Sequence, residues 1–409
     1  MKLADIIDTF ITGDWGEESP TQDTPNAAYC VRGADIVPIT NHNFTAIPQR
    51  YVCDRTKETK LLAAGDLVIE KSGGSPTQST GRIVYVSEDL IKAKGNVVCS
   101  NFCTAFRVKA GWNPLYVYYF WQNVYNHGAF FNFEGKTSGI KNLQLDNALS
   151  AIDIEYLPLE KQNQIVASLA SIDEKIKVNR QINDNLEAMA KQLYDYWFVQ
   201  FDFPNEEGKP YKSSGGAMVW NEKLKREIPQ YWSTLPISAI LDKYPTTKRY
   251  ETKEYLSQGK YPIIDQGDTY IVGYTNEDDN LLTRHPAVLF GDHSTKVKFL
   301  DFDFARGADG TQILYSSNDA VSQYYLYLAV STLQIPNPGY SRHFKYLKEL
   351  PIVIPSLSIA IKFANIVKPL FKKWTNNIFN NIALTKQRNE LLPLLMNGQA
   401  TVNYHLSDD

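Results

Sequence analysis

The sequence predicts an α+β fold in which two mixed α/β domains are held apart by two long, antiparallel, coiled-coil-like helices. A 3.5-residue apolar period runs unbroken from Ile165 to Trp197 and recurs 198 positions later, from Phe363 to Leu395. Blocks rich in Tyr, Phe, Val and Thr, with frequent Gly and Pro turns, precede both periodic stretches. A sustained 3.5-residue period is typical of paired helices. Its recurrence indicates a pseudo-twofold internal repeat.

The repeat divides the chain into five predicted segments. The segment between the two halves, which contains FDFPNEEGKPYKSSGG, has the Pro, Gly and Ser content of a linker. A short apolar strand that ends in proline introduces each helix. In chain order the segments are a first α/β block (1–156), a first long helix (157–200), a linker (201–232), a second α/β block (233–354) and a second long helix (355–400).

The connectivity predicts how the two helices pair. The first helix leads from one block to the next, and its roughly 40 residues would span on the order of 60 Å. The second helix buries its apolar seam most simply by running back antiparallel along the first. A polar residue in such a seam can fix the pairing register, although it can also be merely tolerated at a wet position. The candidate register residues lie at the middle of the two seams: Asn179, Asn183, Asn377 and Asn381.

Composition and charge narrow the class of protein. With 409 residues and 43% apolar content, the chain is long enough for two or three packed domains. Its densest apolar run, LYVYYFW at 115–121, is too short to span a bilayer. The start, MKLADIIDTF, carries acids where a signal peptide would carry bases followed by a longer apolar run, so we expect a cytoplasmic protein. The net charge of −3 does not by itself indicate nucleic-acid binding.

No motif in the sequence predicts an active site or a metal site. NPLY at 113–116 and NPGY at 337–340 resemble the Asn-Pro-Pro-aromatic motif of adenine-N6 methyltransferases. Both lack the second proline, and no glycine-rich turn that would hold S-adenosylmethionine precedes them. The EGK tripeptides at 134–136 and 207–209 lack the Pro-Asp partner of a nuclease site. The four cysteines and six histidines show no zinc spacing, so we expect no catalytic residue and no metal ligand.

Polar, glycine-punctuated loops follow expected strands at comparable points of both blocks. Their side chains are of the types that reach base edges and phosphates, but each alone is also typical of a solvated loop. The prediction of DNA binding therefore depends on their recurrence in both halves. The candidates in the first block are Lys71, Ser72, Ser75, Thr77, Gln78, Arg82, Lys136, Ser138 and Lys141. Those in the second block are Gln266, His293, Ser294, Thr295, Lys296, Tyr340, Ser341, Arg342, His343 and Lys345.

Two stretches resemble a known family. Residues 157–232, beginning LPLEKQNQIVASLASIDEKIKVNRQINDNLEAM, resemble the central conserved region of the specificity subunit of type I restriction-modification systems. LPLLMNGQATV at 392–402 resembles the end of that family's distal conserved region. The resemblance implies that the two blocks are target recognition domains, each reading one half of a split DNA target. It also implies that the helix pair sets the spacer between the half-sites.

The same resemblance implies the partners and cofactors. The expected partners are double-stranded DNA, two methyltransferase subunits and restriction or translocase subunits. Adenine methylation and ATP-dependent cleavage would reside in those subunits, which would bind S-adenosylmethionine, ATP and Mg²⁺, and this chain would bind no cofactor.

Three alternatives remain open at this point. The chain could be a methyltransferase or nuclease with a degenerate motif. It could be the specificity subunit of a related two-subunit system in which one partner both cuts and methylates. It could also be a scaffold whose globular blocks bind protein.

Overall fold

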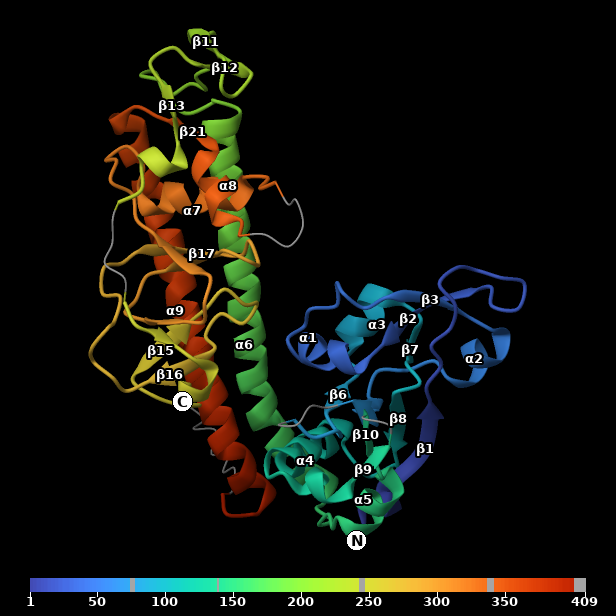
Figure 1. The fold of residues 1–409 in the computed structure, drawn as a ribbon. Helices are drawn as coiled ribbons and strands as arrows, with labels where there is room; N and C mark the ends of the chain where they lie inside the picture. Colours follow the sequence, from blue (N-terminus) through green and yellow to red (C-terminus); the bar gives the residue numbers. More distant parts are fainter. Residues whose placement is uncertain (74–77, 138–139, 243–246, 337–341, 401–409) are drawn as a thin grey trace, which may run out of the picture. The chain divides into compact units, whose positions relative to one another are not determined.

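The computed structural model describes residues 1–73, 78–137, 140–242, 247–336 and 342–400, which form two compact units (Figure 1). Unit 1 comprises Met1–Val178 with Asn381–Asp409, and unit 2 comprises Asn179–Asn380. The long helices α6 (Leu159–Tyr194) and α9 (Leu357–Met396) each contribute residues to both units. The predicted α+β fold with two long helices is thereby confirmed. Within the described ranges, no helix is long and apolar enough to cross a membrane.

The described residues of unit 1 form three small sheets and, apart from the long helices, five short α-helices. The first sheet, in spatial order, is β1 (Ile7–Thr12), β8 (Cys103–Val108), β4 (Leu67–Glu70) and β6 (Ile83–Tyr85). The second is β3 (Gln49–Val52), β2 (Asn26–Val31) and β7 (Val97–Cys99), and the third is β5 (Ser72–Gly73), β10 (Ile140–Leu143) and β9 (Glu134–Thr137). The helices are α1 (Ile36–Thr40), α2 (Asp54–Thr59), α3 (Glu88–Lys94), α4 (Pro114–Asn126) and α5 (Leu145–Ala151).

The NPLY motif of unit 1 begins helix α4. The Asn113 side chain accepts hydrogen bonds from the backbone N–H groups of Leu115 and Tyr116, and Pro114 occupies the first helical position. Both features are typical of a helix N-terminus. The Tyr119 hydroxyl of α4 donates to Asp173 of α6 at 2.6 Å. Within the motif, the Asn113 amide donates to the Asn163 side chain of α6 at 2.7 Å, so the motif also contributes to placing α4 against α6.

In unit 2, the residues that the structure describes form four small sheets and, apart from the long helices, two short α-helices. The largest sheet, in spatial order, is β14 (Arg249–Tyr250), β19 (Ala305–Gly307), β15 (Tyr261–Ile264) and β16 (Gly273–Thr275). Next to it in size is β18 (Val297–Leu300), β17 (Ala287–Gly291) and β20 (Thr311–Leu314). The two-stranded sheets are β11 (Met218–Asn221) with β12 (Arg226–Pro229) and β13 (Ser233–Pro236) with β21 (Pro351–Ile354). The helices are α7 (Gln323–Thr332) and α8 (Phe344–Glu349).

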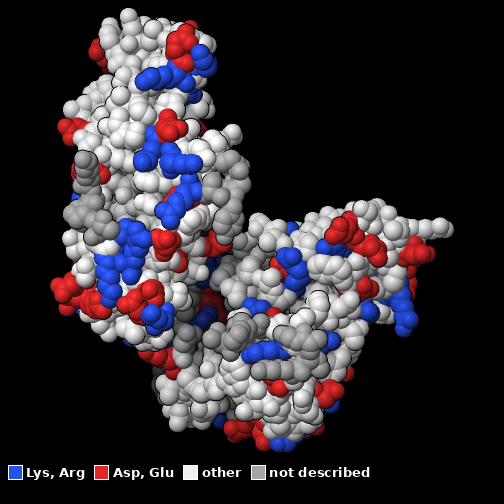
Figure 2. All heavy atoms as spheres, viewed as in Figure 1, with Lys and Arg blue, Asp and Glu red and all other residues white. Residues whose placement is uncertain are grey.

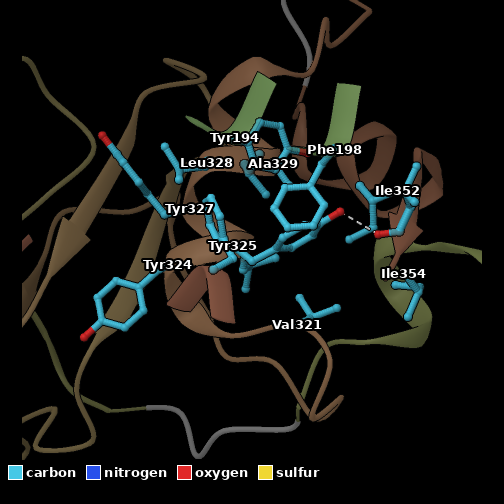
Figure 3. Close-up of a cluster of buried hydrophobic side chains, with 14 of the residues drawn as sticks. Tyr194, Phe198, Val321, Tyr324, Tyr325, Tyr327, Leu328, Ala329, Ile352 and Ile354 are labelled. Carbon is cyan, nitrogen blue, oxygen red and sulfur yellow. Dashed lines mark hydrogen bonds between the residues drawn. The ribbon is translucent and has the colours of Figure 1, made fainter. Parts of the chain in front are cut away.

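The core of unit 2 forms around the tyrosine-rich helix α7 (Figure 3). The Tyr325 hydroxyl, buried in this core, donates to the Val353 carbonyl of β21 at 2.6 Å. Tyr194 and Phe198, from the end of α6 and the π-helical turn after it, pack on the same ring. Burial of each large aromatic side chain contributes roughly 1.5–3 kcal/mol, so this core joins α6, α7 and β21 firmly.

The segment 201–232, predicted as a linker from its composition, folds as part of unit 2. It contains the β11–β12 hairpin. Four of its side chains are buried in the core around α7: Phe201, Phe203, Ile228 and Trp232. Phe203 stacks on Trp232 with ring centroids 4.6 Å apart. Its Pro, Gly and Ser residues thus lie between anchored aromatic side chains.

The helices α6 and α9 run antiparallel within each unit. In unit 1, Arg388 forms an ion pair with Asp173 at 2.8 Å, and the Asn381 amide donates to the Ile176 carbonyl at 3.3 Å. In unit 2, Asn377 donates to the Asn183 side chain at 2.8 Å. Asn183 also donates to the Trp374 carbonyl at 3.1 Å. Two of the four predicted register asparagines are therefore bonded to each other, while their role in setting the register stays a prediction.

Candidate nucleic-acid interface

The predicted loops of unit 1 meet in the sheet β5–β10–β9. The Lys141 backbone of β10 lies opposite Gly73 of β5 on one side and Lys136 of β9 on the other. The Ser72 hydroxyl donates to the Asn142 side chain at 2.5 Å. Residues about 70 positions apart in sequence are thus brought together. Ser75, Thr77 and Ser138 lie outside the described residues.

Lys141 is held by the protein in a mostly buried ion pair. Its ammonium lies 3.0 Å from Glu134, and the two side chains are 14% and 9% exposed. The ammonium also lies over the Phe131 ring and donates to the Gln78 carbonyl at 3.4 Å. Burial raises the pKa of Glu134, but hydrogen bonds from Thr80 and Lys141 outweigh it and hold the pKa below its usual value. The Lys141 charge therefore already has a partner within unit 1.

Arg82 forms a closer ion pair than Lys141 does. Its guanidinium donates two hydrogen bonds to Glu70, at 2.6 and 2.8 Å, and the Glu70 side chain is only 4% exposed. These bonds raise the pKa of Arg82. Gly73 (φ +141°) leaves room for Glu70, because a Cβ there would lie 2.7 Å from a Glu70 carboxylate oxygen. Arg82 thus serves the packing of unit 1, and a DNA contact from it stays a prediction.

Lys71 is the remaining candidate of unit 1 with a described environment. Its backbone N–H donates to the Phe102 carbonyl at 2.8 Å, and its carbonyl accepts from Leu143 at 2.7 Å. Its side chain lines an open hollow of about 460 Å³ together with Phe10 and Gln144. Lys71 thus borders open space, whereas Lys141 and Arg82 are held in ion pairs with mostly buried acids.

The candidates of unit 2 gather around the side chain of Gln266. Its amide nitrogen donates to the Asp309 carbonyl at 2.7 Å, and its amide oxygen accepts from the His293 backbone at 2.9 Å. The Ser294 hydroxyl donates to the Gln266 carbonyl at 2.6 Å. The Thr295 backbone has a positive φ of 56°, which closes the turn between β17 and β18. Gln266 therefore fastens three loops to one another, and both ends of its amide bond the protein.

Helix α8 begins at the same group of loops. The Asp292 carbonyl accepts from the His343 backbone at 2.8 Å, and its carboxylate accepts from the Phe344 backbone at 2.8 Å. The His343 side chain is 4% exposed, with Nδ1 3.0 Å from the same carbonyl. His343 therefore ties α8 to the Asp292 turn and lies below the surface. Tyr340 and Ser341 lie outside the described residues.

The basic side chains of this group in unit 2 are exposed, and two of them lie beside exposed acids. Lys296 lies 2.8 Å from Asp268, with side chains 56% and 86% exposed. Arg342 lies 3.9 Å from Asp309, with 70% and 64% exposed. The Lys345 ammonium lies over the Tyr346 ring at 4.6 Å. Figure 2 shows Lys and Arg atoms directly beside Asp and Glu atoms over the part of unit 2 where Figure 1 labels β15 and β16.

The acids that pair with these basic groups were not predicted from the sequence. Glu134, Asp268 and Asp309 are partners of Lys141, Lys296 and Arg342. Two of these pairs join residues about 30 positions apart. No local spacing signals such pairs, so only the folded chain could reveal them. The described residues contain no cluster of three or more His, Cys, Asp or Glu side chains that could hold a metal ion.

Comparisons with known proteins show which proteins this chain resembles. The model of a family described as type I restriction modification DNA specificity domain matches residues 3–188. The MjaIX type I restriction enzyme specificity subunit of Methanocaldococcus jannaschii is 25% identical over 280 residues, which cover 63% of this chain and 62% of that subunit. Residues 3–188, a little under half of the chain, are thus similar to the DNA specificity domain of type I restriction-modification systems.

Two further proteins are similar to the chain, one over a shorter stretch and one at lower sequence identity. The EcoR124I/EcoR124II specificity subunit of Escherichia coli is 31% identical over 121 residues, 28% of this chain and 29% of that subunit. The matches thus span less than two thirds of both curated subunits. The crystal structure of a type I restriction-modification S subunit from M. genitalium aligns with a TM-score of 0.53 at 15% identity, covering 97% of this chain and 95% of that one. This last likeness shows a shared fold.

Proposed function

We propose that the chain is the DNA sequence-recognition subunit of a type I restriction-modification complex and has no catalytic activity of its own. The observation that carries this proposal is the match of residues 3–188 to the DNA specificity domain of such systems. The two curated relatives described above are both named specificity subunits. The absence of a catalytic motif from the sequence is consistent with this role.

Each unit would read one half of a bipartite target. Support comes from loops of both units: Lys71 borders an open hollow in unit 1, and unit 2 carries Ser294 and the exposed Lys296. In unit 2 the exposed Lys296, Arg342 and Lys345 would contact DNA, while Gln266 would hold the loops in place. Because a rigid loop loses little conformational freedom on binding, such bracing favours discrimination between base pairs.

The helices α6 and α9 would fix the spacer and carry the partners. Their antiparallel contacts within each unit support a continuous helical connection between the two reading surfaces. Two methyltransferase subunits would dock on the chain and supply S-adenosylmethionine, and restriction or translocase subunits would supply ATP- and Mg²⁺-dependent cleavage. The chain itself would bind no cofactor.

The test is to co-express the chain with the methyltransferase subunit of its system and map N6-methyladenine across the host genome at single-base resolution. We expect a split motif with a fixed central gap. The methyltransferase expressed alone is the control and should give no such motif. Absence of new methylation when the two proteins are associated would contradict the proposal.

A further inference from the structure

Two arginines lie side by side in the largest sheet of unit 2. Arg249 of the edge strand β14 is the register partner of Arg306 of β19, in a parallel pairing. Register partners on neighbouring strands project their side chains from the same face of a sheet. Like charges placed directly opposite each other destabilise a sheet. The two positive charges therefore destabilise the sheet unless a negative group lies close enough to offset their repulsion.

Arg306 has no carboxylate partner among the described residues. It is 8% exposed, and its guanidinium donates to the Thr247 carbonyl at 2.9 Å. Its Nε is buried without a hydrogen-bond partner in the described part of the chain. Burial, together with the charge of Arg249, lowers the pKa of Arg306. A buried guanidinium left without an anion is costly, so this geometry indicates that an anion from outside the chain completes the site.

One acid, Asp309, stands among three arginines. Its carboxylate forms an ion pair with Arg249 and lies 3.9 Å from Arg342. Its charge also opposes the lowering of the Arg306 pKa that burial and Arg249 cause. The Asp309 carbonyl accepts from Gln266, which joins this site to the loops that carry His293 and Lys296. Three guanidinium groups against one carboxylate leave an excess of two positive charges.

We propose that Arg249 and Arg306, with Arg342 at the rim, form a binding site for one backbone phosphate of DNA, and that Asp309 occupies Arg249 until the phosphate displaces it. The planar guanidinium fork suits a phosphate because it can donate two parallel hydrogen bonds. The inference rests on the proposed DNA recognition. It adds two residues, Arg249 and Arg306, and a competing acid that weakens binding to DNA of any sequence.

The test measures the affinity of the chain, in complex with its methyltransferase subunit, for a random-sequence duplex at KCl concentrations from about 50 to 200 mM. Each phosphate contact adds about 0.9 to the slope of log affinity against log salt. Across this range the wild-type complex should therefore lose about 3.5-fold more affinity than the Arg249→Gln or Arg306→Gln complex. Asp309→Asn should bind the duplex more tightly than wild type at every salt concentration.

Three matched variants keep the result interpretable. Lys209→Gln removes a charge from an exposed ion pair elsewhere in unit 2 and should leave the slope unchanged. Arg306→Lys keeps the charge and should retain the wild-type slope. Arg249 is half-exposed, so its replacement tests the site even if Arg306→Gln fails to fold.

The outcomes separate this inference from the function on which it rests. Unchanged slopes in Arg249→Gln and Arg306→Gln, with wild-type binding intact, would overturn the phosphate site and leave DNA recognition standing. A wild-type complex that binds no duplex would overturn both. Thermal stabilisation by inorganic phosphate that is lost in Arg306→Gln, without any effect on duplex binding, would assign the site to a small anion and overturn the DNA contact.

Discussion

The two units hold their basic loop residues in opposite ways. In unit 1, the partners of Arg82 and Lys141 are acids whose side chains are 4% and 9% exposed. In unit 2, the partners of Lys296 and Arg342 are acids that are 86% and 64% exposed. Breaking a buried pair leaves an uncompensated buried charge, whereas an exposed pair contributes little and is screened by salt. Loops of similar composition thus hold their basic side chains in buried ion pairs in unit 1 and in exposed ion pairs in unit 2. Only the exposed pairs can be broken at little cost when another anion binds.

The largest effect is expected from the buried pair of unit 1. Arg82→Met should lower the free energy of unfolding by about 3–5 kcal/mol, because Glu70 would keep its buried charge without a partner. Urea unfolding of the full chain measures this. Lys209→Gln, in an exposed pair, is the control and should not shift the midpoint. A midpoint for Arg82→Met equal to that of the control would remove the distinction between the units.

A smaller loss of stability, about 1–3 kcal/mol, is expected from Lys141→Gln, which leaves Glu134 with fewer hydrogen bonds. Because the pKa of Glu134 is lowered in the folded chain, its ionised form contributes stability above the ordinary value of 4.5. That contribution is lost as the pH falls through the lowered pKa. The difference in urea midpoint between wild type and variant should therefore shrink from neutral pH to about pH 3. A difference that grows on acidification would contradict the ion-pair assignment.

In unit 2, replacing an exposed basic residue is expected to change DNA binding and not the stability of the fold. Arg342→Ala should leave the urea midpoint unchanged, since its nearest acid is exposed and 3.9 Å away. It should weaken binding to the methylated motif by about 1–3 kcal/mol. Relaxed specificity would assign a base contact, and uniformly weaker binding with a shallower salt slope would assign a phosphate contact. Unchanged affinity would remove Arg342 from the interface.

The smallest effect is expected from Lys296→Gln. Its ion pair with Asp268 is exposed, so stability should not change. The salt slope of DNA binding should fall by about one unit if the ammonium contacts a phosphate. The same duplex titration compares it with Lys345→Gln, whose ammonium lies over an aromatic ring. A loss of stability as large as that of Arg82→Met would show that the Lys296 ion pair stabilises the fold, as the Arg82 ion pair is expected to do.

The sequence predicted the large features of the fold because they follow from periodicity. The 3.5-residue repeat predicted the long helices α6 and α9. The sequence could not show that Arg82 is held by a buried acid while Arg342 is exposed. That difference depends on whether the side chain faces the core or the solvent, which the folded chain decides.

The sequence allowed the candidate loops to be predicted, but not which of their side chains are exposed and which are buried or bonded within the protein. His343 and Gln266 have the residue types of readers, yet one is buried and the other has both amide ends bonded to the protein. Asp309 carried no signal, because its partners Arg249 and Arg342 lie 60 and 33 positions away. The linker prediction at 201–232 relied on Pro, Gly and Ser content, and the aromatic anchors Phe203 and Trp232 override that composition.

The central claim is that two separate surfaces read the target while the helices set the spacing. Its most direct test deletes one heptad from each helix, residues 176–182 and 378–384, which retains both Asn183 and Asn377. Seven residues shorten a helix by about 10.5 Å, or about three base pairs of DNA. Mapping N6-methyladenine with the co-expressed methyltransferase should reveal the same two half-sites with a shorter gap. Altered half-sites, or an unchanged gap between unaltered half-sites, would contradict the account.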